Sequence, residues 1–184
     1  MHQRRCLLCL IAFTLVLGPL HALAQAQTHV TPEKFVGAWK LISVETIRPN
    51  GEVIYPFYGK HPQGLIMYDR SGWMSVQIVS DPAATSPGSG SWEEILAAPQ
   101  PDKAKAYENY YAYCGTWTLD PAAKTVTHHI QQSLRPGERG DNAVRHFELD
   151  GDRLILTAKT HEMGEDHERK LVWERLSASQ NALK

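Results

Sequence analysis

Hydrophobic and polar residues alternate in short stretches along most of the chain after Pro32, and turn-forming residues separate these stretches. Alternation with a period of two is typical of strands that have one buried face. Arg70-Ser71-Gly72 and Asp150-Gly151-Asp152 each lie between two such stretches and predict tight hairpins. The predicted strands span residues 40–48, 52–56, 64–69, 73–79, 115–119, 125–133, 143–149, 153–161 and 168–176. Eight or nine consecutive short strands without a βαβ rhythm predict an all-β barrel or sandwich.

Residues 80–112 interrupt this strand pattern, and their first part is rich in Pro, Gly and Ser, as in a loop. Ser91 and Glu94 have the spacing of a capping box, which predicts a short helix. Asp102 can act as the N-cap of a second helix that ends near Tyr111. The insertion also carries large apolar and aromatic side chains that favour burial: Trp92, Ile95, Leu96, Tyr107, Tyr110 and Tyr111. We therefore expect the insertion to cover one barrel opening as a lid or a plug.

The first 24 residues have the order of features found in a signal peptide. Arg4 and Arg5 precede an apolar run, and Ala22-Leu23-Ala24 forms a small-x-small cleavage site, with a second possible cut after Ala26. The apolar run has about a dozen residues, fewer than the roughly 20 that span a bilayer. We expect a cleaved signal peptide, a periplasmic or secreted protein, and no membrane anchor after cleavage.

Cleavage changes both the charge and the cysteine content of the chain. The loss of two arginines takes the formal net charge from −1 to −3, and no run of like charges stands out, which argues against nucleic acid as a partner. Of the 3 cysteines only Cys114 remains, so no intramolecular disulfide can form, and we expect this thiol to be buried. The mature chain then consists of a tail over 25–34, a barrel domain over 35–176 and a C-terminal tail over 177–184.

Two motifs mark the ends of the predicted barrel domain. Gly37-Ala38-Trp39 opens the first strand, and Arg175 lies near the end of the last strand. The first and last strands of an up-and-down barrel are neighbours, because closure pairs them. We expect the Arg175 guanidinium to lie across the Trp39 indole as a cation–π pair, which gives Gly37, Trp39 and Arg175 a structural role.

This Gly-x-Trp motif with a terminal arginine resembles the signature of the lipocalin family. An ordered series of further stretches is similar to the bacterial lipocalin-like domain family: 64–69, 72–78, 110–117, 126–129, 145–154 and 172–175. The resemblance covers residues 35–175, and it implies an up-and-down antiparallel β-barrel with an internal cavity. The fold by itself does not imply one particular function.

The strand alternation also predicts which polar side chains face the barrel interior. His128 shares a strand face with Val126 and Ile130, and Arg145 shares one with Phe147. In the strand before them, Tyr113 and Trp117 share a face. The candidate ligand-binding residues are therefore His128, Arg145, Tyr113, Trp117 and Phe147. Arg145 could bind an anionic group, His128 could act as acid or base, and Glu45 is the expected internal partner of Arg145.

Three kinds of function remain open at this point. The first is binding of a small, mostly apolar molecule, with or without an anionic group, in the barrel cavity. The second is an isomerase, cyclase or dehydratase that uses His128 and Arg145, and the third is a structural or interaction module with a filled barrel. His161 and His167 are six residues apart across a turn, which does not fit a zinc-protease helix, and no cofactor motif is present. We expect no cofactor or metal, and a small hydrophobic or amphipathic molecule as the partner.

Overall fold

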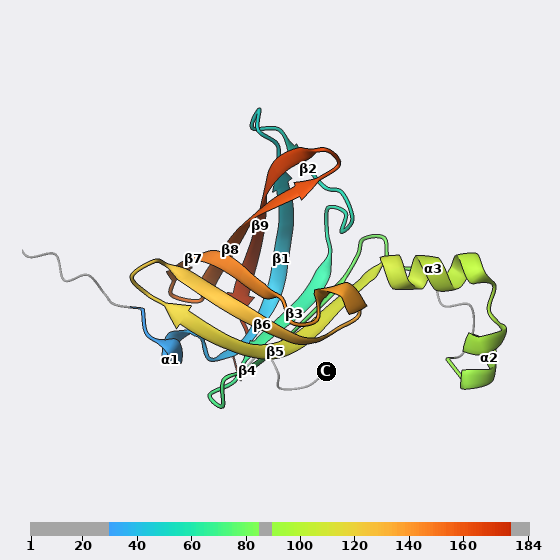
Figure 1. The fold of residues 1–184 in the computed structure, drawn as a ribbon, viewed down its shortest axis with the longest axis horizontal. Helices are drawn as coiled ribbons and strands as arrows, with labels where there is room; N and C mark the ends of the chain where they lie inside the picture. The colour runs from blue at the N-terminus through green and yellow to red at the C-terminus, as the bar shows by residue number, and fades with distance from the viewer. Residues whose placement is uncertain (1–29, 85–89, 178–184) are drawn as a thin grey trace, which may run out of the picture.

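The computed structural model describes residues 30–84 and 90–177. The expected signal peptide and nearly all of the C-terminal tail lie outside these described residues. The barrel strands are β1 (Gly37–Ile47), β3 (Gln63–Tyr68), β4 (Trp73–Val79), β5 (Tyr110–Asp120), β6 (Thr125–Ser133), β7 (Asn142–Asp150), β8 (Arg153–Glu162) and β9 (Glu165–Arg175). Each strand pairs antiparallel with the next one in this series, and β9 pairs with β1 to close the barrel (Figure 1). The short β2 (Val53–Ile54) pairs antiparallel with Thr46 and Ile47 at the end of β1. The predicted up-and-down antiparallel barrel is thus confirmed.

A β-bulge in β1 changes which of its side chains face the core. Leu41 pairs with Trp173, but Ser43 pairs with the adjacent residue Val172, so Ile42 is an extra residue on β1. One extra residue moves all following side chains to the opposite face. Val44 and Thr46 are consequently buried, and Glu45 lies on the other face, where it forms an ion pair with Lys170. The expectation that Glu45 is the internal partner of Arg145 is therefore wrong.

A short helix closes one end of the barrel. Helix α1 (Pro32–Phe35) places the Phe35 ring in the core, 4.9 Å from the Phe147 ring centroid and 5.6 Å from that of Tyr68. The Trp39 indole donates a hydrogen bond of 2.9 Å to the Phe35 carbonyl, which ties the helix to β1. Residues from Pro32 onward therefore take part in closing this end of the barrel.

The insertion between β4 and β5 is helical, as the capping box predicts. Helix α2 (Trp92–Ala97) begins where the Ser91 hydroxyl accepts a hydrogen bond from the Glu94 amide, and α3 (Gln100–Glu108) follows it. Both helices extend away from the barrel, and they cover neither of its ends (Figure 1). Trp92 is 75% exposed and Leu96 is 71% exposed. The lid or plug prediction is therefore wrong: the apolar side chains of α2 stay exposed. Helix α3, which joins α2 to β5, has one large apolar side chain, Tyr107, and so lacks an apolar stripe that could bind the barrel mouth.

Two further differences concern β5. This strand begins at Tyr110, so Tyr110 and Tyr111 belong to it and not to the second helix. Cys114 is only half-buried, since the Tyr113 side chain before it points into the barrel and the thiol faces outward.

In the part of the chain that the structure describes, no helix is long and apolar enough to cross a membrane.

A candidate ligand cavity in the barrel

A cavity of about 210 Å³ lies inside the barrel, and strands β3 to β9 all contribute to its wall. Its apolar lining consists of Ile66, Val76, Ile78, Leu156 and Leu171. Its polar lining comes from aromatic and aliphatic hydroxyls, an indole, an imidazole and charged groups: Tyr58, Tyr111, Tyr113, His128, Arg135, Glu138, Arg145, Thr160, Glu162, Arg169 and Trp173. The barrel is therefore not completely filled by side chains, and its interior is mixed in polarity.

His128 connects two tyrosines beside this cavity. Its Nε2 atom is 2.7 Å from the Tyr68 hydroxyl, and its Nδ1 atom is 2.7 Å from the Tyr113 hydroxyl. Burial, the nearby Arg145 charge and His129 lower the pKa of His128 to about 3, so the imidazole is neutral at pH 7. Burial raises the pKa of Tyr113 to about 12 despite the opposing effect of Arg145, and it raises the pKa of Tyr68 well above the usual range. All three groups are therefore uncharged at neutral pH.

Arg145 brings a positive charge to this otherwise neutral group. It is half-buried, lines the cavity, and donates a 3.2 Å hydrogen bond to the Val144 carbonyl. Within residues 30–84 and 90–177, no carboxylate lies within the 4.0 Å that defines an ion pair with its guanidinium. β7 pairs with β8 only from His146 onward, so Arg145 lies where these two strands separate. The guanidinium therefore sits at an edge of the cavity wall, in reach of the Tyr113 hydroxyl, and none of its donors is taken by a carboxylate of the described residues.

Three further polar atoms of the cavity lining are buried without a hydrogen-bond partner among the described residues. They are Trp173 Nε1, Thr160 Oγ1 and Arg169 Nε. Leaving a buried donor unpaired costs about 1–3 kcal/mol. The indole N–H of Trp173 and the Nε–H of Arg169 can only donate. The cavity therefore presents an excess of hydrogen-bond donors to whatever occupies it.

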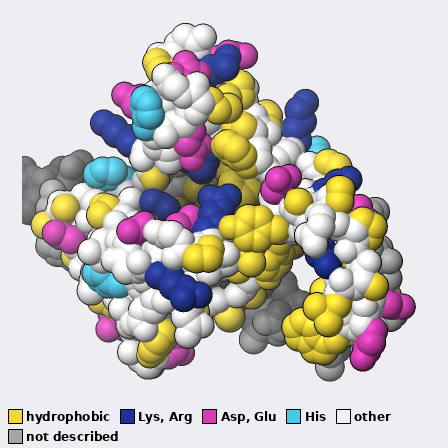
Figure 2. Space-filling model, turned by 45° about the vertical axis from the view of Figure 1, so that its right-hand side comes forward, with side chains coloured by type: hydrophobic (Ala, Val, Ile, Leu, Met, Phe, Trp, Pro, Cys, Tyr) yellow, Lys and Arg dark blue, Asp and Glu magenta, His cyan; other side chains and the backbone are white. Residues whose placement is uncertain are grey.

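A loop and two ion pairs surround the open end of the cavity. Tyr58 is buried there, and the β2–β3 loop that carries it is held by the Asp81 amide, which donates a 2.9 Å hydrogen bond to the Tyr58 carbonyl. Arg169 pairs with Glu162 and lies 5.9 Å from the Tyr58 ring centroid, while Arg135 pairs with Glu138 at 3.6 Å. Figure 2 shows charged side chains of both signs beside a hollow in one face of the molecule. The Tyr58 loop, and not the helical insertion, thus borders the mouth.

The comparison with protein families agrees with this architecture. The family model described as a lipocalin-like domain matches residues 36–176, which is most of the chain. The chain belongs to the lipocalin-like domain family. No curated protein matches it. The family assignment supports ligand binding in general, since barrels of this type have room for a small ligand.

The lipocalin-like domain brings three of the five predicted binding residues to the cavity, namely Tyr113, His128 and Arg145. Trp117 and Phe147 also face inward, but they pack on Phe35 with ring centroids 6.0 Å and 4.9 Å away. They belong to the core of the closed end, where α1 inserts Phe35, and neither of them lines the cavity. Sequence reasoning missed Arg169 at the mouth, although its shared strand face with Leu171 and Trp173 could have indicated it.

At the closed end of the lipocalin-like domain, Arg175 lies across the Trp39 indole with its Cζ atom 4.0 Å from the ring centroid. Its Nη1 atom donates a 2.8 Å hydrogen bond to the Val36 carbonyl. Gly37 has a φ of +132°, and a Cβ atom there would lie 3.0 Å from Arg175 Nη1. A glycine therefore lets the backbone pass under the guanidinium.

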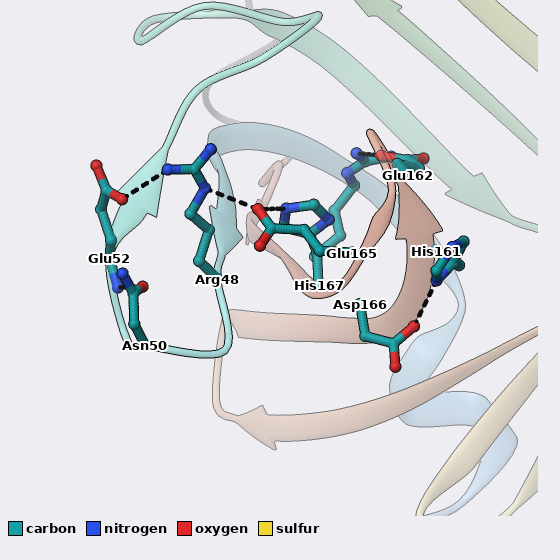
Figure 3. Close-up of polar contacts among 9 residues, drawn as sticks. Arg48, Asn50, Glu52, His161, Glu162, Glu165, Asp166 and His167 are labelled. Atoms are coloured by element: carbon teal, nitrogen blue, oxygen red, sulfur yellow. Dashed lines mark hydrogen bonds and ion pairs between the residues drawn. The ribbon is translucent and has the colours of Figure 1, made fainter.

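The β8–β9 hairpin of the lipocalin-like domain carries a separate polar cluster (Figure 3). Arg48 contacts Glu52 at 2.8 Å and Glu165 at 2.9 Å, and Glu165 in turn contacts His167 at 3.1 Å. His161 is exposed and pairs with Asp166 instead. No group of three or more His, Cys, Asp or Glu side chains within the described ranges could hold a metal ion. These contacts form a network that connects the β1–β2 turn to the hairpin.

Proposed function

We propose that this lipocalin-like domain binds a small, mostly apolar molecule in the barrel cavity, with a polar end of that molecule at Arg145. The observation that carries the proposal is the half-buried Arg145 guanidinium, which lines the cavity and has no carboxylate partner among the described residues. A charge taken out of water is costly unless another group pairs with it. A polar or anionic group of the ligand would supply that partner, while the apolar wall would contact the rest of the ligand.

The cavity volume limits the size of the ligand. The cavity measures about 210 Å³. Pockets that enclose drug-sized molecules measure roughly 300–1,000 Å³. The proposed ligand is therefore smaller than such compounds, unless part of it extends out of the open end of the cavity.

Native mass spectrometry of the protein purified from its own host tests this proposal. We expect a co-purifying small molecule on the unmodified protein and on Arg70→Met, which changes an exposed arginine in the β3–β4 turn. Arg145→Met keeps most of the side-chain volume but removes the charge, so we expect it to lose the adduct. An adduct of equal abundance on all three proteins, or on none of them, would contradict the proposal.

The enzyme alternative has less support than binding. Both ring nitrogens of His128 are occupied by tyrosine hydroxyls, and its pKa of about 3 is far from the neutral range in which a general acid or base works best. The filled-barrel alternative conflicts with the cavity itself. Binding is therefore the function that the geometry supports best.

We propose in addition that the protein is exported after removal of its signal peptide. The support is the order of basic, apolar and small residues in the first 24 positions. The mature chain should begin at Gln25 or Gln27. Intact-mass measurement on protein recovered from the periplasm or the medium checks this, and a chain that still begins at Met1 would contradict it.

A further inference from the structure

The hydrogen-bond chain through His128 has a direction, and this direction determines what the cavity offers to a ligand. A neutral imidazole has one nitrogen that donates and one that accepts. Because both nitrogens lie 2.7 Å from a tyrosine hydroxyl, one tyrosine must donate to the ring and the other must accept from it. Two arrangements are possible, and they differ in which tyrosine keeps a free hydroxyl proton.

Tyr68 decides between the two arrangements. It is 2% exposed, does not line the cavity, and lies against the rings of Phe35 and Trp117. His128 is the one hydrogen-bond partner of its hydroxyl among the described residues. If Tyr68 accepted from the ring, its own proton would be buried without an acceptor, at a cost of about 1–3 kcal/mol. Tyr68 therefore donates to Nε2, and the proton of the imidazole is on Nδ1.

This choice leaves the proton of the Tyr113 hydroxyl free to point into the cavity. The Nδ1–H of His128 donates to Tyr113 Oη, so Tyr113 uses a lone pair for His128 and keeps its own proton for another acceptor. Tyr113 and Arg145 both line the cavity, and Trp173 adds a buried indole N–H without a partner in the described part of the chain. Three donors thus converge on one space.

We propose that the cavity selects a carboxylate, which is held by Arg145 and the Tyr113 hydroxyl, and that Tyr68 and His128 are positioning residues that direct this hydroxyl. A carboxylate has two acceptor oxygens and one negative charge, which match a guanidinium and a second donor. A dianionic phosphate fits less well, since Arg135 and Arg169 at the mouth are already paired with Glu138 and Glu162. This inference rests on the proposed function and adds the chemical class of the ligand.

The first test needs no ligand. Nitrogen-15 NMR of the imidazole of His128 reports which ring nitrogen carries the proton. We expect a protonated Nδ1 and an unprotonated Nε2 at pH 7, whereas a proton on Nε2 would overturn the inference. Tyr68→Phe removes the hydroxyl that fixes the tautomer, so we expect the proton to be shared between Nδ1 and Nε2 in this variant. Tyr107→Phe, which changes an exposed residue of helix α3, is the matched control and should leave the tautomer unchanged.

The second test uses matched pairs of small probes. Calorimetry at pH 7 with benzoate, phenylacetate and hexanoate, each against its amide, should show about tenfold tighter binding of at least one acid. Tyr68→Phe should lose part of the preference that Tyr113→Phe loses, although Tyr68 does not line the cavity. If no acid binds more tightly than its amide, the carboxylate assignment is overturned. A co-purifying neutral molecule that depends on Arg145 would in that case still support the proposed function.

Discussion

Two arginines on the barrel wall have opposite surroundings. Arg175, at the closed end, donates to the carbonyls of Val36 and Lys34, contacts Asp152 at 3.2 Å and stacks on Trp39. Arg145, in the cavity, donates to the carbonyl of Val144, its neighbour in sequence. The guanidinium at the closed end is therefore committed to the fold, whereas the guanidinium in the cavity is left with donors for another molecule.

The side chains around these arginines differ in the same way. The closed end is a packed aromatic core in which the Trp39 and Trp117 indoles both donate hydrogen bonds to backbone carbonyls. In the cavity, the Trp173 indole is equally buried but has no partner among the described residues. One end of the barrel thus stabilises the domain, and the other keeps polar groups that the fold itself does not use.

The largest effect should come from removing the centre of the closed end. Trp39 is 0% exposed, so Trp39→Ala should lower the free energy of unfolding by about 3–5 kcal/mol through lost burial and a remaining cavity. Urea denaturation measures this change. Trp92→Ala is the matched control in the exposed helix α2 and should change the free energy of unfolding by less than about 0.5 kcal/mol. An equal loss of unfolding free energy in both variants would contradict this prediction, since it would mean that Trp92 is buried as deeply as Trp39.

Acid should lower the free energy of unfolding through His128, which lies beside the cavity. The unfolded chain takes up a proton on this ring near pH 6.5, whereas the folded barrel keeps it neutral down to about pH 3. The unfolded state therefore binds more protons between these values, and the stabilisation present above pH 6.5 falls by about 1.4 kcal/mol per pH unit. Between pH 6.5 and 4.5 the loss attributable to His128 is about 2–3 kcal/mol. Urea denaturation at both pH values measures it, and His128→Gln should remove this part of the loss. An unchanged pH dependence in the variant would refute the assignment.

Arg175→Met should have a smaller effect of the same sign. It removes the charge over the Trp39 ring and the hydrogen bonds to two carbonyls but keeps the apolar stem. We expect the free energy of unfolding to fall by about 1–2 kcal/mol, as measured in urea. No change in stability would show that the closed end does not depend on this guanidinium, and the contrast with Arg145 would lose its basis.

The parts of this fold that depend on local pattern could be predicted from the sequence. Turn residues and period-two alternation located the hairpins, and closure of an up-and-down barrel brought Trp39 and Arg175 together. Alternation also placed His128 and Arg145 on the cavity side, because no bulge lies between them and the apolar residues of the same strands.

Other features depend on tertiary contacts that no local pattern contains. The bulge at Ile42 reversed the side on which Glu45 lies, and its one trace in the sequence is that Val44 is out of phase with Trp39 and Leu41. The capping box at Ser91 correctly predicted a helix but could not say what that helix packs against. The position of Tyr58 at the mouth depends on a hydrogen bond from Asp81 to its carbonyl and on one from Ser80 to the Phe57 carbonyl, and both donors are more than 20 residues away along the chain.

The stability of Arg145→Met tests the central contrast most directly. If Arg145 is kept for a ligand and not for the fold, its replacement should change the free energy of unfolding of the ligand-free protein by less than about 0.5 kcal/mol, or increase it, since an unpaired charge leaves the cavity wall. Urea denaturation beside the unmodified protein and Arg175→Met gives this number. A loss of about 1 kcal/mol or more, as large as that of Arg175→Met, would show that Arg145 belongs to the structural network of the barrel and would contradict the account.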